Sequence, residues 1–236
     1  MPASGQDWTT PDDLQAHHTN AWRKHERGLF SLHTTPAFAI SQRAFLLQTG
    51  AGNILWDCIA LIDDATVELV RALGGLSAIA ISHPHYYTRM QDWSRAFGGI
   101  PIYLHAADQV WIMRPDPRIH LWEGDLFQIA PGATLIRLGG HFSGGTVLHW
   151  RDTEDSAGLL LAGDIVQVAS DVRRVSFLWS YPNMMPLPAR EVLRIGQALA
   201  PWTFDRIYGA FVGKEVPRDG NQVVAQSVGR YVELLT

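Results

Sequence analysis

Three short stretches of the sequence carry side chains that can bind a metal ion, and each stretch follows an apolar run. They are Ser82-His83-Pro84-His85, Gly139-Gly140-His141-Phe142-Ser143-Gly144-Gly145 and Leu161-Ala162-Gly163-Asp164. Strand ends on one edge of a sheet can bring residues that are distant in the sequence to one point, where loops carry the functional groups. Three imidazoles and a carboxylate make a complete ligand set for zinc or iron. We therefore expect a metal site formed by His83, His85, His141 and Asp164.

The local sequence around each of these residues favours that interpretation. His83 and His85 are alternate residues, which point the same way in an extended segment, and Pro84 favours an extended conformation at His83. Glycines around His141 let the backbone pass close to a ligand. The Asp164 carboxylate follows an apolar strand, where it must find hydrogen bonds or a cation. Singly, each residue could be an ordinary strand-end, turn or capping residue, but their joint occurrence favours the metal site.

The composition limits the classes of protein to which the chain can belong. Its 236 residues suit a single domain over 1–236, and 47% hydrophobic residues is ordinary for a globular core. A net charge of -4 without a basic block argues against nucleic acid as a partner. No apolar run approaches the roughly 18 residues of a membrane span, and the first residues lack the apolar core of a signal peptide. With one cysteine, Cys58, the chain fits a reducing compartment, so we expect a cytoplasmic protein that acts on a small molecule.

The elements that must position these residues can be read from the spacing of apolar positions. Residues 1–28 are expected to be a polar arm, with a helix over 11–27 that Thr10 caps and Pro11 begins. Short apolar or alternating segments predict β-strands over 37–40, 44–48, 53–57, 76–82, 101–104, 125–129, 134–137, 146–150, 159–162 and 206–208. Helical spacing predicts helices over 66–73, 90–97, 106–113, 189–199 and 223–235. Two groups of strands with interleaved helices predict two sheets packed face to face, with helices outside.

In this order of motifs the chain resembles the metallo-β-lactamase superfamily, over roughly residues 35–215. A hairpin-rich start that ends in an aspartate, here Asn53-Ile54-Leu55-Trp56-Asp57, precedes a His-x-His motif, a Gly-His loop and a Gly-Asp strand end. The resemblance implies an αββα sandwich of the α/β class with the metal site at one edge. It also implies a structural or outer-shell role for Asp57 and a metal-dependent hydrolase whose substrate is unknown.

The chain departs from the family pattern at the ligands of the second metal ion. The family motif continues with aspartate and histidine, where this chain has Tyr87 and Thr88, and no histidine follows His149. The family's last histidine would fall near 209–213. The resemblance therefore implies a mononuclear site, with zinc as the first choice and iron or manganese as alternatives. Asp92 and Asp171 are the residues that we consider as replacements for the missing ligands.

The expected chemistry is hydrolysis. A zinc ion lowers the pKa of a bound water to about 7 and so supplies hydroxide at neutral pH. Asp164 would be a ligand or accept a hydrogen bond from that water. Tyr87, or its neighbour Tyr86, would donate a hydrogen bond to a substrate oxygen, the alternative for both being packing under a loop.

Two other functions fit the same residues. One is an iron dioxygenase, because the persulfide-dioxygenase branch of the superfamily uses ligands that match His83, His141 and Asp164, although the rest of that branch's pattern is not found in this sequence. The third interpretation is a non-catalytic module that binds a metal for stability.

The segment 176–188 is rich in aromatic, methionine and proline residues and has no period. Such a segment suits an apolar pocket wall, an interface between copies of the chain in a homo-oligomer, or a buried connector. Within it, Tyr181 is the residue that we expect to contact substrate.

Overall fold

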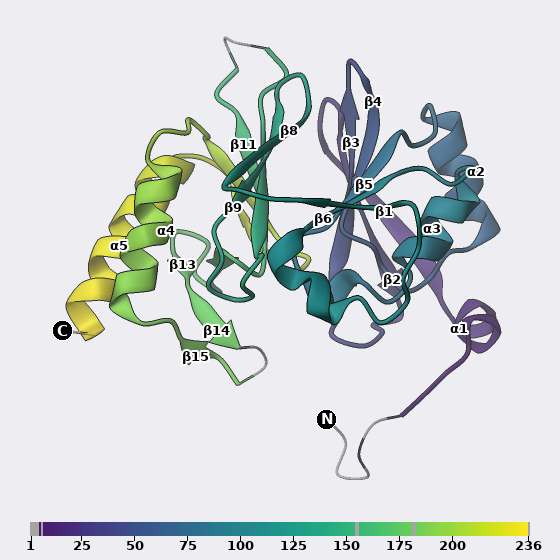
Figure 1. Ribbon diagram of the computed structural model, residues 1–236, viewed down its shortest axis with the longest axis horizontal. Coiled ribbons are helices and arrows are strands. Elements are labelled where there is room, and N and C mark those ends of the chain that lie inside the picture. The colour runs from purple at the N-terminus through teal and green to yellow at the C-terminus, as the bar shows by residue number, and fades with distance from the viewer. Residues whose placement is uncertain (1–4, 6, 154–155, 181–182, 236) are drawn as a thin grey trace.

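Two β-sheets pack against each other, and helices cover their outer faces (Figure 1). The structure is a computed structural model that describes residues 5, 7–153, 156–180 and 183–235. The four layers are those of the predicted αββα sandwich, which the structure confirms.

In the described part of the chain, the first sheet has seven strands in sequence order. They are β1 (Thr19–Glu26), β2 (Leu29–Thr35), β3 (Arg43–Thr49), β4 (Gly52–Trp56), β5 (Ala78–Ala80), β6 (Ile102–His105) and β7 (Ile119–Trp122). The first four pair antiparallel, whereas the strands from β4 onward pair in parallel. The parallel strands need crossovers, which α2 (Asp64–Ala72), α3 (Met90–Ala96) and the short 3₁₀ helices η1 (Pro84–Tyr86) and η2 (Ala106–Trp111) supply.

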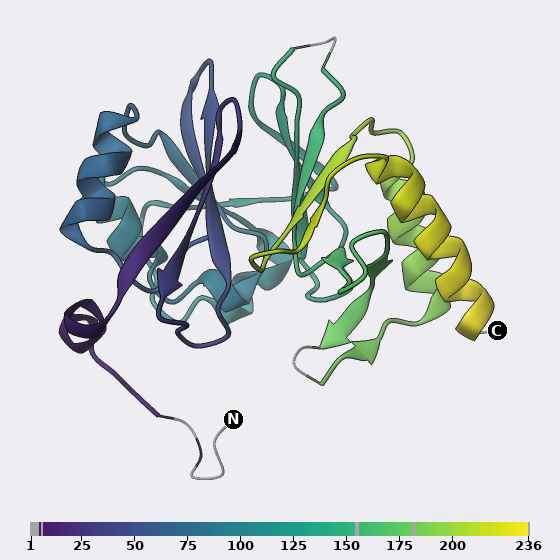
Figure 2. The same ribbon diagram turned by 180° about the vertical axis from the view of Figure 1, so that it is seen from behind.

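The second sheet is assembled from the later part of the chain, in the order β17-β16-β11-β10-β9-β8. Its strands are β8 (Leu126–Ala130), β9 (Ala133–Arg137), β10 (Thr146–Trp150), β11 (Leu159–Gly163), β16 (Arg206–Gly209) and β17 (Glu215–Val216). Two small hairpins precede α4 (Ala189–Leu199), namely β12 (Gln167–Val168) with β13 (Val175–Ser176), and β14 (Leu178–Ser180) with β15 (Met185–Pro186). The last helix, α5 (Gly220–Leu235), lies beside α4 on the outer face (Figure 2).

The apolar patterns of the strands explain the layering. Along β11 every residue is buried, and successive side chains enter different cores because strand side chains alternate between faces. Leu161 packs between the two sheets, whereas Leu160 and Ala162 pack under α4 and α5. On α4, Val192 and Ile195 lie on the face that covers this core.

The N-terminal segment differs from the prediction of a long helix within a polar arm. The helix α1 (Pro11–His17) begins where expected, with the Thr10 hydroxyl accepting from Asp13 N at 3.1 Å, but it ends at His17. From Thr19 the chain is β1, at the edge of the first sheet (Figure 2). No residue of β1 is fully buried, so its sequence carries no apolar run that would have marked it as a strand.

Other differences are local. Residues 37–40 form a turn and not the predicted strand, because Ala39 and Ser41 have φ values of +50° and +59°, which lie outside the β region. The strands β2 and β7 were not predicted, and the helix predicted over 106–113 is the 3₁₀ helix η2. Among the helices in the described ranges, none is both long enough and apolar enough to cross a membrane.

Candidate metal centre

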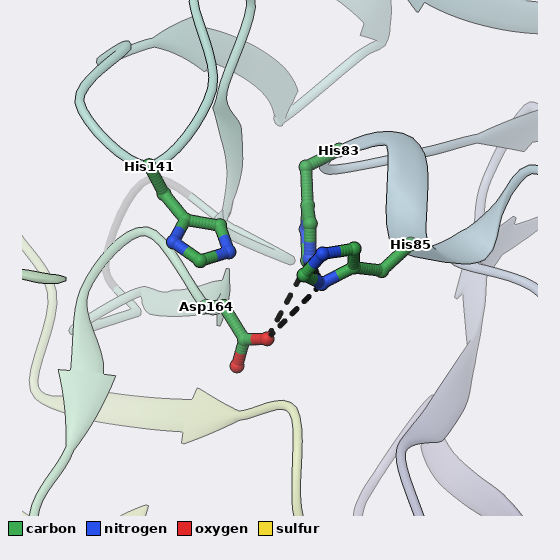
Figure 3. Close-up of side chains that lie close together, drawn as sticks. All are labelled: His83, His85, His141 and Asp164. Atoms are coloured by element: carbon green, nitrogen blue, oxygen red, sulfur yellow. Dashed lines mark hydrogen bonds and ion pairs between the residues drawn. The ribbon is translucent and has the colours of Figure 1, made fainter. Parts of the chain in front are cut away.

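Four loop or strand-end residues from both sheets come together at one edge of the sandwich (Figure 3). His83 follows β5 in extended backbone and begins η1, which contains His85. His141 lies in the loop between β9 and β10, and Asp164 directly follows β11. The two sheets are tied together beside the cluster, because Thr146 N at the start of β10 donates to the carbonyl oxygen of Ser82 at 2.9 Å. The structure thus brings together all four predicted residues.

The donor atoms of these residues are spaced as ligands of one ion would be. One ligand atom from each residue lies within 4.8 Å of the others. His83 Nε2 is 3.1 Å from His85 Nδ1 and 3.6 Å from Asp164 Oδ2, and His85 Nδ1 is 4.0 Å from the same oxygen. Ligands at about 2.0–2.1 Å from a tetrahedral zinc ion are roughly 3.3 Å apart. The separations of 3.1 and 3.6 Å lie close to that spacing, whereas the widest separation in the cluster, up to 4.8 Å, must shorten by about 1.5 Å for all four atoms to share one ion.

His141 has one ring nitrogen in a hydrogen bond and the other free to bind a metal ion. Its Nδ1 lies 3.0 Å from the carbonyl oxygen of Leu178, so that nitrogen bears the proton and donates it. The other nitrogen, Nε2, is buried, faces the cluster and has no hydrogen-bond partner among the described residues. A buried lone pair without a partner is costly, and an imidazole held by a carbonyl at one nitrogen is the usual arrangement of a metal-binding histidine.

His83 is oriented by a chain of hydrogen bonds that begins at β4. The Ser82 hydroxyl donates to Asp57 Oδ1 at 2.8 Å and lies 2.7 Å from His83 Nδ1. Because the hydroxyl proton goes to Asp57, the serine oxygen accepts from Nδ1–H, and His83 Nε2 is left to face the cluster with its lone pair. Gly163 makes room for this contact, since a Cβ there would lie 2.7 Å from Ser82 Oγ. The outer-shell role that the resemblance implies for Asp57 agrees with this geometry.

Asp164 is almost completely buried, at 1% exposure. Its Oδ2 faces the histidines and accepts from Gln42 Nε2 at 3.0 Å, whereas its Oδ1 is buried with no partner in the described part of the chain. Burial alone would raise the pKa of Asp164, but the imidazoles of His83 and His85 hold it well below its usual range. Burial lowers the pKa of His83 to about 4, a shift that Asp164 only partly offsets. Neutral imidazoles beside an ionised carboxylate are the protonation states that a cation requires.

Asp108 supports the loop that carries His141, and Phe142 covers the cluster. The sequence predicted a role for neither residue. Asp108, in η2 and buried, accepts from Gly144 N at 2.7 Å, and a Cβ on Gly144 would lie 2.8 Å from its carboxyl group. Phe142 packs against the three imidazoles, with ring centroids 5.2–5.7 Å apart. The phenyl ring covers one side of the cluster with apolar surface.

The remaining predicted residues lie elsewhere or outside the described chain. Tyr87 is buried in the core between the first sheet and α3, so it packs where the family has a metal ligand, and its catalytic role stays a prediction. Tyr181 lies outside the described residues. Asp92 is bound by Arg89, Arg95 and Arg114, and Asp171 by Arg173, so neither joins the cluster.

The local geometry of the His-x-His pair differs from the extended segment that we expected. Only His83 is extended, whereas His85 lies in the 3₁₀ turn of η1. The two rings still meet, because the turn brings His85 Nδ1 back toward His83.

A cavity of about 590 Å³ adjoins the cluster at His85 and Gln42. Its walls come from α1 and the segment before it, from the turn after β2, and from the loop after Asp57. Apolar side chains such as Trp8, Phe38 and Ile59 contribute to these walls. Its size suits a small organic molecule.

Comparisons with known proteins agree with this architecture. No protein-family model matches the chain. It is 45% identical over 233 residues to the uncharacterized protein YmaE of Bacillus subtilis, covering 98% of this chain and 84% of YmaE.

Among solved structures, the mono-zinc form of the metallo-β-lactamase FIM-1 from Pseudomonas aeruginosa is 14% identical, with a TM-score of 0.66 over 90% of this chain and 96% of that one. The structure of VMB-1 is 11% identical, with a TM-score of 0.69, and the match covers 92% of this chain and 98% of VMB-1. The metallo-β-lactamase family protein TTHA1429 from Thermus thermophilus is 17% identical, with a TM-score of 0.59, and the match covers 87% of this chain and 80% of TTHA1429. At these identities the likeness establishes the fold.

Proposed function

This chain belongs to one family with YmaE and has the metallo-β-lactamase fold, and on that premise we propose that it is a metal-dependent hydrolase with a mononuclear site. His83, His85, His141 and Asp164 hold one divalent ion, zinc before iron or manganese. The substrate is a small molecule, and the single buried cysteine fits action in the cytoplasm.

The observation that carries this proposal is the unpartnered Nε2 of His141. That atom is buried and aimed at a point that His83 Nε2, His85 Nδ1 and Asp164 Oδ2 also face. Those three atoms contact one another, whereas His141 Nε2 has no hydrogen-bond partner in the described chain, and buried polar atoms are rarely left in that state. A bound zinc ion would supply a Lewis acid and a water acidic enough to attack a substrate at neutral pH.

The residues of this chain would bind and orient the reactants. The cavity beside His85 admits the substrate, and its apolar walls favour substrates with an apolar portion over highly charged ones. Phe142 restricts bulk water on one side of the cluster. Asp164 would be a ligand of the ion or accept a hydrogen bond from the attacking water, and its lowered pKa keeps it ionised for either role.

We also propose that Tyr87 assists catalysis by donating its hydroxyl proton to a substrate oxygen. Its burial favours packing as the competing role. A Tyr87→Phe variant separates the two, since it keeps the ring. Turnover reduced about tenfold or more with unchanged thermal stability would support catalysis, and unchanged turnover would assign Tyr87 to packing.

The proposal is tested on protein purified without chelators. Elemental analysis should find about one equivalent of zinc, iron or manganese per chain, and a panel of esters, lactones and phosphodiesters should reveal hydrolysis that chelation abolishes and the metal restores. Stoichiometric metal without any hydrolysis would favour the binding module. Absence of metal would overturn the assignment.

Four converging donors favour this function over the iron dioxygenase. The dioxygenase needs two histidines and a carboxylate with open positions for oxygen and substrate, whereas His85 Nδ1 also lies in the cluster, 3.1 Å from His83 Nε2. An oxygen electrode with thiol persulfides decides the matter, because iron-dependent oxygen uptake would replace hydrolysis as the activity.

A further inference from the structure

Gln42 is the one neutral donor that the structure places on the carboxylate of the cluster, among the residues it describes. Its Nε2 donates to Asp164 Oδ2 at 3.0 Å, and this is the same oxygen that faces His83 and His85. A carboxylate oxygen offers two lone-pair directions. One is turned toward the histidines, and the Gln42 amide takes the other.

The backbone around Gln42 holds the amide in place. Gln42 forms an antiparallel bridge with Phe211, and Arg43 N donates to the carbonyl oxygen of Ala210 at 2.8 Å. The buried Arg43 side chain donates to the carbonyl oxygen of Gly209 at 2.9 Å and forms an ion pair with Glu215. The start of β3 is thereby fixed to the segment after β16, which places the Gln42 side chain beside Asp164.

We propose that Gln42 restricts the cluster to a single cation, an inference that rests on the proposed metal site. An amide N–H is a positive end of a dipole and cannot be deprotonated at ordinary pH, so it excludes a second cation from the side of Asp164 that it occupies. In the described chain, the group of donor atoms close enough to share an ion contains no further histidine, cysteine or carboxylate, and the nearby Asp57 is engaged by Ser82. Gln42 is thus a positioning residue, which fixes the orientation of Asp164 and the number of ions.

A second consequence concerns the strength of the first ion's binding. The hydrogen bond from Gln42 holds the buried Asp164 carboxylate in the orientation that presents Oδ2 to the histidines. Outer partners of this kind usually contribute 10–100-fold to metal affinity. Loss of the amide should therefore weaken the first ion without removing any ligand.

The test is a calorimetric titration of the full chain, freed of metal, with Zn²⁺ and separately with Co²⁺. The original chain should bind one ion, and Gln42→Ala should bind one ion about tenfold more weakly. Gln42→Glu replaces the amide with a carboxylate beside Asp164 and should bind two ions. Gln128→Glu is the charge-matched control, because Gln128 is exposed on β8, and it should bind one ion like the original chain.

Two ions bound by the original chain would overturn the proposal, as would a single ion bound by folded Gln42→Glu or unchanged affinity in Gln42→Ala. If Gln42→Glu does not fold, the affinity of Gln42→Ala still decides whether Gln42 positions Asp164. Failure of this inference can be told apart from failure of the proposed function. Two ions bound by the original chain would contradict the role of Gln42 but would still be compatible with a metal-dependent hydrolase. If the original chain bound no ion, the proposed function itself would be wrong.

Discussion

At the scale of single residues, the cluster is defined by which atom of each side chain is already engaged. His83 and His141 each use Nδ1 in a hydrogen bond and turn Nε2 toward the same point. Asp164 shares its Oδ2 between the histidines and Gln42. These partners select the tautomers and orientations before any ion arrives, which lowers the cost of organising the site.

Replacement of His141 by alanine should lower zinc affinity by more than about a hundredfold, exceeding the effect typical of outer partners. The reason is that it removes one of four ligands and the only buried imidazole lone pair in the cluster that lacks a partner in the described chain. Competition with a chromogenic chelator measures the change. His120→Ala, at an exposed position on β7, is the matched control and should leave the affinity unchanged. Equal affinity in both variants would remove His141 from the site.

At the scale of elements, the cluster depends on loops that are anchored to strand ends. The 139–145 loop is held by Asp108 of η2, and the turn of η1 is set by the Pro84 that follows an extended His83. The hydrogen bond from Thr146 to Ser82 joins the two sheets at the place where the ligands emerge. These contacts anchor the loops to the strands beside them.

Removal of the Asp108 carboxylate should loosen the loop that carries His141. The change Asp108→Ala leaves the buried Gly144 N–H without its acceptor, which should lower the free energy of unfolding by about 1–3 kcal/mol. It should also weaken zinc binding. Urea denaturation with and without zinc measures both effects, and Asp125→Ala, at an exposed carboxylate, serves as the comparison. If Asp108→Ala is as stable as Asp125→Ala, the carboxylate does not anchor the loop.

The sequence predicted that the four residues of the cluster would come together because they follow apolar runs. It also predicted strands such as β10 and helices such as α4, because their apolar residues are regularly spaced. It did not predict Gln42 or Asp108, because their contacts cross between segments distant in the chain and leave no local pattern. The strand β1 was missed for a related reason, since an edge strand pairs through its backbone and needs no apolar run.

At the scale of the whole molecule, burial gives the metal-free protein a stability that depends on pH. His83 and His25 both have their pKa lowered to about 4, mainly by burial, and burial also lowers the pKa of His141. An unfolded histidine titrates near 6.5. The unfolded state therefore binds more protons below that pH, and the folded state loses stability as the pH falls from 6.5 toward 4.

For His83 alone, this linkage removes about 2 kcal/mol of stability between pH 7.5 and pH 5. Asp164 acts in a lower range, because its depressed pKa contributes stability that is lost only below the ordinary carboxyl pKa. Denaturant unfolding of metal-free protein at several pH values measures the effect. The variant His83→Ala should flatten the profile, and a profile of unchanged steepness would contradict the assignment to His83.

The central claim is that one cation binds where the two sheets meet. An anomalous-scattering map from crystals grown with zinc tests it most directly. The account predicts a single peak within about 2.0–2.2 Å of His83 Nε2, His85 Nδ1, His141 Nε2 and Asp164 Oδ2. A map with no peak there, or with a peak that these four atoms do not share, would contradict it.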